Sequence, residues 1–389
     1  MKKKTLPKLY SIILLIVVTS IVASLTTAVI LLNNDVTSSV DLNNDNNLKQ
    51  FLNIYASISE NYYEDINKKE MLEEAIAAML NYLGEDYSTY LDKDQTDSLT
   101  QILEGKYEGI GIEIIQNREI YNVFKDSPAE KAGLQKGDII LLVNDTSLEE
   151  KKADEIIKES TTSIIKIKIL RNETELEIFV ERSIVNIPAV ASEMIEQNGH
   201  KIGYLSISAF SNNVYSQFKS ELEVLENQGI QKLIIDVRNN SGGYLSAANN
   251  IIQLFLKKGK VMYSLETKTD NEVYKDNTDE SRDYPVVILT NKGSASASEI
   301  LAAALKDSYG AVVIGNTTYG KGKVQHTKSL DSGSMIKYTS SKWYTPIGVC
   351  IDEVGLEPNL FIDLEIDAEG NILDKQKEKA IEFLLSVWH

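Results

Sequence analysis

The sequence has one cysteine and three histidines among its 389 residues, and these shortages exclude some kinds of protein. Cys350 alone can form no intramolecular disulfide, so stability must come from packed hydrophobic cores. The length leaves room for two or three domains. A formal net charge of -17 gives no electrostatic reason to expect nucleic acid or anionic lipid as a partner.

The few histidines also argue against a histidine-based catalytic triad. His200 lies in a predicted turn, and His389 ends the chain. His326 follows Gln325 on a predicted strand, where alternation turns neighbouring side chains to opposite faces. If the chain is a hydrolase, its general base is therefore expected to be a residue other than histidine.

Charge is missing from one long stretch near the N-terminus. Leu9 to Leu32 is a run of 24 uncharged, mainly apolar residues, which is long enough to cross a bilayer as a helix. Lysines precede the run and none follows it closely, so the body of the protein is expected outside the cytoplasm. We predict a retained signal anchor in the membrane of a bacterial cell surface or envelope; a cleaved signal peptide is the alternative.

A run of small residues, Asn291 to Ile300, lies between a strand-like stretch (284–290) and a helix-like one (299–306). Such a strand-to-helix turn exposes a hydroxyl and points the first free N–H groups of the helix toward negative charge. Ser296 is therefore a candidate nucleophile. The alternative is structural, because Ser296 and Glu299 also match a capping box.

Lys321 lies 25 residues after Ser296, in a Gly-Lys-Gly turn that follows another strand-like stretch, Ala311 to Gly315. A lysine can take a proton from serine only when it is neutral. Its ordinary pKa of about 10.4 would therefore have to fall toward about 7 to 8, and burial can cause such a fall. We predict a buried Lys321 amine; a solvated loop charge is the alternative.

Together these two segments resemble the C-terminal processing peptidases, also called tail-specific proteases, which use a Ser/Lys dyad. The resemblance implies that Ser296 is the nucleophile and Lys321 the base. It also implies that Gln325, four residues beyond the lysine, assists it. We expect Gln325 to hold the Lys321 amine by a hydrogen bond without adding negative charge.

A third segment, 232–245, is an apolar strand that runs into a glycine-rich turn. It is similar to a stretch of the same family that supplies a backbone N–H to the oxyanion hole. The resemblance implies donors at Gly242 or Gly243 and at Ala297. Ser241 stands where relatives often have proline, which should alter the stiffness of the turn more than its chemistry.

Residues 107–182 alternate as short strands, expected at 120–124, 139–143, 164–170 and 174–180, with helices near 129–132 and 151–160. The region resembles a PDZ domain, most specifically at Ser127 to Ile140. The family implies that the loop made by Gly109, Ile110, Gly111 and Ile112 receives a peptide C-terminal carboxylate on backbone N–H groups. A small β-barrel without a ligand is the alternative.

Some side chains are expected to be structural. The tyrosines of the helical N-terminal part, Tyr87 among them, are predicted to pack in a core or between domains. The same is expected of Trp343, with a place in the substrate cleft as the alternative, and Glu299 is expected to hold the fold. In some relatives a PDZ arginine senses the docked peptide; Arg171 is the candidate here, and a solvated turn arginine is the alternative.

The predicted fold is a multidomain α/β protein. A crotonase-like α/β protease core carries an inserted, β-rich PDZ-like domain, an N-terminal helical segment and one transmembrane helix. The expected divisions are a cytoplasmic tip and anchor (1–33), a linker and helical segment (34–104), the PDZ domain (105–184) and the serine protease core (185–389).

The resemblance implies a membrane-anchored serine endopeptidase that recognises protein C-terminal tails. Its expected partners are proteins or peptides with free C-terminal tails, and the membrane through one helix. No cofactor, metal or nucleic acid is expected, and the oligomeric state stays open, with a homodimer as one alternative. Two other functions are a non-catalytic cell-surface PDZ scaffold and a crotonase-like acyl hydrolase.

Overall fold

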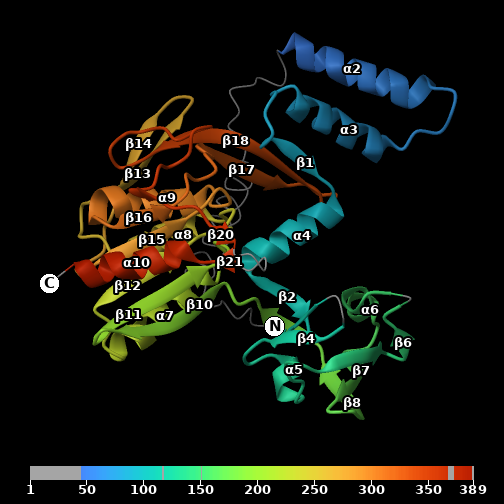
Figure 1. Cartoon of the computed structure of the whole chain (residues 1–389). Coiled ribbons are helices and arrows are strands. Elements are labelled where there is room, and N and C mark those ends of the chain that lie inside the picture. The colour runs from blue at the N-terminus through green and yellow to red at the C-terminus, as the bar shows by residue number, and fades with distance from the viewer. Residues whose placement is uncertain (1–44, 116–117, 150, 367–371, 388–389) are drawn as a thin grey trace, which may run out of the picture. The chain divides into compact units, whose positions relative to one another are not determined.

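The structure is a computed structural model that describes residues 45–115, 118–149, 151–366 and 372–387 (Figure 1). The chain divides into two compact units, 1–76 and 77–389. In these described ranges no helix combines the length and the apolar character needed to cross a bilayer. The predicted anchor, 9–32, lies outside them.

The described part of the first unit is helical. Helix α2 (Asn46–Asn61) begins at Asp45, whose carboxylate accepts the N–H groups of Asn47 and Leu48 at 2.9 and 3.1 Å. Helix α3 (Lys68–Asn81) follows and continues into the second unit.

The second unit carries helices and strands in alternation. Its helices after α3 are α4 (Lys93–Glu104), α5 (Pro128–Lys131), α6 (Ala153–Glu159), α7 (Val214–Asn227), α8 (Leu245–Ile252), α9 (Ala297–Ala304), the π-helical turn η2 (Leu305–Tyr309) and α10 (Lys375–Ser386). Its strands are β1 (Thr89–Leu91), β2 (Lys106–Gly109), β3 (Ile112–Ile114), β4 (Ile120–Val123), β5 (Ile139–Val143), β6 (Thr146–Ser147), β7 (Ile164–Arg171), β8 (Thr174–Glu181), β9 (Ser183–Asn186), β10 (Val190–Gln197), β11 (His200–Ile207), β12 (Lys232–Asp236), β13 (Val261–Thr267), β14 (Asn271–Lys275), β15 (Val286–Thr290), β16 (Val312–Gly315), β17 (Lys323–Ser329), β18 (Met335–Tyr344), β19 (Leu360–Phe361), β20 (Glu365–Ile366) and β21 (Ile372–Leu373).

A six-stranded sheet forms the centre of the core, in the order β10-β11-β12-β15-β16-β19. Strand β10 is antiparallel to β11, and the other pairings are parallel. Strands β12 and β15 are buried at every position, as expected of parallel strands covered on both faces. The strand-like stretches predicted at 284–290 and 311–315, and the apolar strand of the segment 232–245, all belong to this sheet.

Helices cover both faces of this sheet. Leu233 and Ile235 pack in a cluster with α7, α8 and α9, whereas Ile234 faces Ala380 and Leu384 of α10 on the other side. The alternation of neighbouring residues between two hydrophobic clusters explains why β12 reads as a continuous apolar run.

A second, five-stranded sheet has the order β1-β18-β13-β14, with β17 also paired to β18. Its register places Lys337 of β18 between Thr89 on one side and Thr327 on the other. Neither β18 nor β1 was predicted from the sequence. Strand β1 interrupts the segment 34–104, whose folded part was expected to be helical, and α4 begins after Asp92, which forms a capping box with Gln95.

Residues 106–186, which resemble a PDZ domain, form the sheet β6-β5-β7-β8 and the pairs β3-β4 and β2-β9. Their core is aliphatic and includes Ile120, Ile140, Val143, Ile165 and Ile167. The strands expected at 120–124, 139–143, 164–170 and 174–180 are present, each within a residue of the predicted ends.

An ion-pair cluster joins the central sheet to the last helix. Arg238, just after β12, pairs with Asp236 at 2.6 Å and with Asp374 at 2.7 Å. Asp374 caps α10 by accepting the N–H of Lys377, and Tyr204 donates its hydroxyl to Asp236. The buried carboxylate of Asp236 therefore depends on Arg238 for compensation.

Replacing Arg238 by alanine should lower the free energy of unfolding by about 3 to 5 kcal/mol, because it leaves the buried Asp236 charge unpaired. The urea midpoint of the full chain measures this loss. The matched control is Lys375→Ala on α10. Lys375 forms a solvent-exposed ion pair with Glu378, and the loss of this pair should lower the free energy of unfolding by less than about 1 kcal/mol. Equal midpoints for the two variants would contradict the role of Arg238.

Candidate active site

Three turns follow neighbouring parallel strands at their carboxyl ends. We call them the asparagine turn (239–243, after β12), the serine turn (291–296, after β15) and the lysine turn (316–322, after β16). The carboxyl ends of parallel strands meet at one edge of a sheet, where ligands of open α/β folds bind. The topology therefore brings together segments that are far apart in the sequence.

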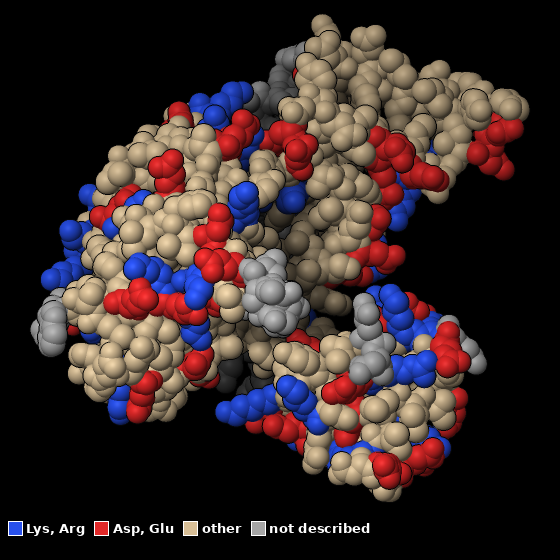
Figure 2. Space-filling model, viewed as in Figure 1, with Lys and Arg blue, Asp and Glu red and all other residues tan. Residues whose placement is uncertain are grey.

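These turns line a cavity of about 510 Å³. The cavity contains all six residues predicted for catalysis and the oxyanion hole: Ser296, Lys321, Gln325, Gly242, Gly243 and Ala297. Its charged lining residues, within the part of the chain that the structure describes, are Lys321 and Lys337, with no carboxylate. By contrast, acidic and basic side chains are interspersed over the face shown in Figure 2.

Ser296 has an unusual backbone conformation, with φ 54° and ψ -115°. A positive φ is unfavourable for a residue with a side chain, and such strain persists where the surroundings enforce it. Glu299 accepts the Ser296 N–H at 2.7 Å, as in a capping box, while the Glu299 N–H donates to the Ser296 carbonyl at 2.9 Å. Among the described hydrogen bonds the Ser296 hydroxyl has no close partner, and Ser296 lines the cavity.

The serine turn and the start of α9 are tied by hydrogen bonds to the segment from Val237 to the asparagine turn. Ala295 N–H and Ser298 Oγ both donate to the Asn240 carbonyl, at 3.0 and 2.8 Å. Ser294 Oγ donates to the Val237 carbonyl at 2.8 Å. Ser294, Ser298 and Asn240 are fully buried, so these bonds hold the turn that carries Ser296 from below in a dry environment.

The two glycines of the asparagine turn have different surroundings. A Cβ on Gly242 would lie 2.9 Å from Ser296 Cβ, so only glycine allows this close approach. The Gly242 N–H is already used, because it donates to Asn240 Oδ1 at 2.9 Å. In the described hydrogen bonds neither the Gly243 N–H nor the Ala297 N–H has an acceptor, which favours Gly243 over Gly242 as the partner of Ala297.

The lysine turn is held by the same carboxylate as the serine turn. Glu299, fully buried, accepts Thr318 Oγ1 at 2.5 Å, Gly320 N–H at 2.7 Å and Lys321 N–H at 3.0 Å. Trp343, also buried, donates its indole N–H to the Lys321 carbonyl at 2.8 Å. Glu299 and Trp343 are thus structural, as predicted, and both fix the backbone from which the Lys321 side chain projects.

The surroundings of the Lys321 side chain favour loss of its proton. Burial lowers the pKa of its ammonium group below the ordinary value, and the positive charge of Lys337 lowers it further. The negative charges of Glu299 and Glu85 oppose this shift. The direction agrees with the prediction of a desolvated lysine.

One aromatic neighbour of Lys321 was not predicted. Tyr87 places its ring 4.9 Å from Lys321 Nζ and 5.6 Å from Lys323 Nζ. Burial and a hydrogen bond with Tyr319 raise the pKa of the Tyr87 phenol to about 12, so it stays protonated. Sequence reasoning grouped Tyr87 with packing tyrosines because nothing local connects it to the lysine turn; the connection depends on the pairing of β1 with β18.

Gln325 lines the cavity but does not contact Lys321 in the expected way. Its amide donates to Thr339 Oγ1 at 3.4 Å, and no hydrogen bond to Lys321 occurs among the described residues. A register shift between Val324 and Gln325 allows both neighbours to face the cavity. The assisting role of Gln325 stays a prediction.

Two further candidates, His326 as a base and Arg171 as a sensor of the docked peptide, make contacts outside the cavity. His326 is exposed, lies outside the cavity lining, and packs against Tyr338 with ring centroids 5.4 Å apart. Arg171 pairs with buried Asp138 at 2.6 Å and donates to the Gly133 carbonyl. It is therefore held within the PDZ-like region and is not a free turn arginine.

The predicted peptide-binding loop, from Gly109 to Ile112, has a backbone conformation that favours glycine at Gly111. Gly111 has φ 86°, and the Ile110 and Gly111 carbonyls accept the N–H groups of Ala129 and Phe124. Burial raises the pKa of the Tyr107 phenol, whereas the nearby backbone N–H groups of Gly111 and Ile112 act to lower it. A carboxylate that used these N–H groups would have to displace Tyr107.

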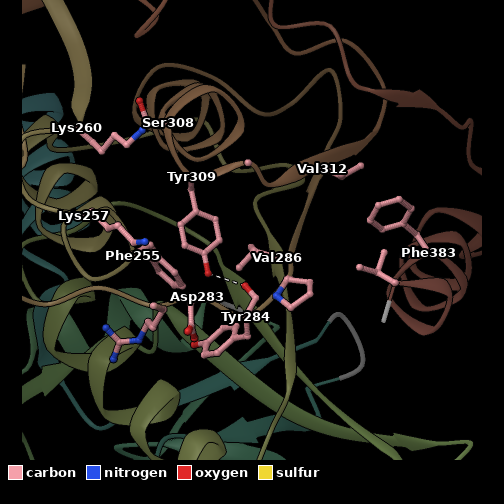
Figure 3. A pocket seen from close by; sticks show the side chains of 14 residues that line it. Phe255, Lys257, Lys260, Asp283, Tyr284, Val286, Ser308, Tyr309, Val312 and Phe383 are labelled. Atoms are coloured by element: carbon pink, nitrogen blue, oxygen red, sulfur yellow. Dashed lines mark hydrogen bonds between the residues drawn. The ribbon is translucent and has the colours of Figure 1, made fainter. Parts of the chain in front are cut away.

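A second cavity, of about 460 Å³, lies near the other end of the sheet and is shown in Figure 3. Tyr309 donates its hydroxyl to the Tyr284 carbonyl there at 2.6 Å, and the Tyr284 hydroxyl and Arg282 both bind Glu226. These polar groups satisfy one another, and the lining serine, Ser308, donates its hydroxyl to the Val261 carbonyl. The first cavity is the better candidate for chemistry.

Three family models match the chain. Peptidase family S41 matches residues 201–362, the N-terminal domain of the activating protease CtpB matches 21–95, and the PDZ domain matches 119–171. These matches confirm the resemblance found in the sequence. They do not test the roles of individual residues.

Among curated relatives, the carboxy-terminal processing protease CtpB of Bacillus subtilis is 36% identical over 335 residues, covering 84% of this chain and 70% of the relative. A probable CtpA-like serine protease of Staphylococcus aureus is 33% identical over 340 residues, covering 85% and 68%. Among solved structures, the photosystem II D1 C-terminal processing protease has a TM-score of 0.50 at 25% identity, covering 83% of this chain and 89% of the other. A putative S41 protease of Bacteroides fragilis, with a TM-score of 0.53 at 17% identity and coverage of 83% and 97%, shares the fold.

The reactivity of Ser296 should rise with pH as Lys321 loses its proton, with a midpoint below the ordinary lysine value of 10.5. The rate of phosphonylation of Ser296 by a fluorophosphonate, followed from about pH 6 to about pH 10, measures this. Lys321→Arg should abolish the reaction, because arginine stays protonated throughout the range. A flat profile, or a reactive arginine variant, would rule out Lys321 as the base.

Glu299→Gln should separate the two effects of the carboxylate, which are to hold the two turns and to raise the pKa of Lys321. The amide cannot accept from both turns, so the free energy of unfolding should fall by about 2 to 3 kcal/mol and the maximal rate of Ser296 labelling should drop. Because the negative charge of Glu299 raises the pKa of Lys321, its removal should move the pH midpoint downward. The exposed Glu357→Gln is the control and should leave both quantities at native values. An upward shift of the midpoint in Glu299→Gln would contradict this account.

Proposed function

Because the chain belongs to peptidase family S41, and is therefore a serine-type peptidase, we propose that it cleaves protein substrates with Ser296 as nucleophile and Lys321 as general base. One observation carries this assignment. A serine in a strained turn shares a cavity with a lysine of lowered pKa, beside two backbone N–H groups that have no acceptor among the described residues.

In the proposed reaction neutral Lys321 takes the proton from Ser296 Oγ, which attacks the carbonyl carbon of the scissile peptide bond. The N–H groups of Gly243 and Ala297 bind the oxygen on which negative charge develops. Protonated Lys321 then gives its proton to the leaving amine, and an acyl-enzyme remains. A water molecule, deprotonated by the same lysine, hydrolyses the ester and restores Ser296.

We further propose that the PDZ domain, assigned to 105–184, binds the C-terminal tail of the substrate on the loop from Gly109 to Ile112. Backbone N–H groups suit a carboxylate, and displacement of the Tyr107 phenol would accompany docking. The uncharged run 9–32 supports a membrane anchor with the catalytic body, 185–389, outside the cytoplasm. Such an anchor would enrich substrates of the same membrane near the site.

The test uses the full chain and an unstructured protein substrate with either a free apolar C-terminus or the same tail capped as an amide. The native chain should cleave the free-tailed form faster. Ser296→Ala and Lys321→Ala should each lower the rate by about 1000-fold or more, because the two groups act as a unit. His326→Ala, outside the cavity, should keep the native rate and serves as the control.

Cleavage that survives in either dyad variant would overturn the assignment of nucleophile and base. Equal cleavage of free and capped tails would remove tail recognition while leaving the peptidase intact. Binding of the free tail without any cleavage would favour the alternative of a non-catalytic PDZ scaffold.

A further inference from the structure

The catalytic cavity is positively charged in a protein that is otherwise acidic. The chain has 57 aspartates and glutamates against 40 lysines and arginines. Nevertheless, the charged side chains in the described lining of the cavity are Lys321 and Lys337, and none is acidic. If Lys321 is neutral in the reactive state, Lys337 supplies the remaining charge.

Lys337 reaches the cavity from the second sheet. It lies on β18 directly opposite Thr327 of β17, which lines the same cavity. Cross-strand partners share a face of the sheet, and alternate residues along a strand do too. Thr339 and Gln325 are therefore on the cavity side with Lys337, whereas His326 is turned away and exposed.

Lys337 has no compensating partner among the residues that the structure describes. In the described part of the chain its amine makes no ion pair or side-chain hydrogen bond, although the side chain is half-buried. Nearby Lys323 is also half-buried but lies within 3.6 Å of Glu85 and 3.7 Å of Asp352. A cation that is partly removed from water and left unpaired costs free energy. A bound carboxylate would offset that cost.

We propose that Lys337 binds a carboxylate of the substrate segment lying in the catalytic cavity, and so helps to select substrates; this rests on the proposed function. The rest of the lining indicates what accompanies the carboxylate. Leu99, Ile102 and Leu103 of α4, with Ile300 and Val324, supply apolar surface. The favoured substrate therefore carries an apolar side chain and a carboxylate within a few residues of the cleaved bond.

Two sources can supply this carboxylate. One is the α-carboxylate at the end of a short tail, and the other is an aspartate or glutamate side chain in a longer one. Both present the same oxygen pair to an ammonium group. This recognition differs from docking on the PDZ loop, because it takes place beside Ser296 and uses a side-chain cation in place of backbone N–H groups.

The test compares the full chain with Lys337→Met, which keeps the length of the side chain without its charge, and with Lys337→Arg, which keeps the charge. Lys328→Met is the matched control, since Lys328 lies on β17, is exposed, and is outside the cavity lining. One peptide pair differs only in a free or amidated C-terminus. A second, amidated pair has aspartate or asparagine near the cleaved bond.

In the native chain kcat/KM should favour the peptide with the carboxylate in at least one pair, and the pair that responds identifies the source. Lys337→Met should reduce this preference about 10-fold, the usual size of a charge-assisted contact, while Lys337→Arg and Lys328→Met keep it. Labelling of Ser296 by a fluorophosphonate confirms that the methionine variant is folded. It should also show a pH midpoint moved upward, since the Lys337 charge lowers the pKa of Lys321.

An unchanged preference in Lys337→Met would overturn the proposal and assign the preference to the PDZ domain. So would the absence of any preference in an active native chain. If the native chain neither cleaves peptide nor reacts with the fluorophosphonate, the proposed function has failed. The role of Lys337 is then tested by peptide binding. In the Ser296→Ala background, the ratio of the affinity for the carboxylate peptide to that for the neutral peptide should still fall with Lys337→Met.

Discussion

The buried carboxylate of Glu299 is the interaction on which the catalytic site depends. It accepts hydrogen bonds from Ser296 N–H, Thr318 Oγ1, Gly320 N–H and Lys321 N–H, and so joins the serine and lysine turns. Each of these donors would cost about 1 to 3 kcal/mol if left buried without an acceptor. The arrangement has a price, because the same negative charge raises the pKa of Lys321, the proposed base.

The sheet limits where such a site can form. Strands β12, β15 and β16 are parallel neighbours, so the three turns that follow them meet at one edge. Gly242 allows the asparagine turn to approach Ser296, and Asn240 fixes the serine turn from beneath. The positive φ of Ser296 can persist because hydrogen bonds hold the backbone on both sides of it.

The sequence predicts those parts of the structure that local patterns determine. The buried strands are continuous apolar runs, and the residues of the three turns follow strand ends, so Ser296, Lys321 and the glycines could be found. Strand β18 carries Lys337 and Lys342 among serines and threonine, a pattern without a clear period, and its pairing with β1 is set by tertiary contacts. Tyr87 and Lys337 reach the site through that pairing, so no local signal marks them.

The charges around Lys321 are best understood through the transition state. Burial and Lys337 favour the neutral amine of Lys321, whereas Glu299 and Glu85 favour the ammonium that would form if, as proposed, the amine takes the proton of Ser296. A substrate carboxylate at Lys337 would favour the ammonium form, as Glu299 and Glu85 do, and would offset part of the effect of the Lys337 charge. Its binding would therefore lower the fraction of Lys321 that is neutral but stabilise the positive charge that develops on it. A base must be neutral before the reaction and charged after it, so an intermediate pKa suits Lys321 better than a strongly lowered one.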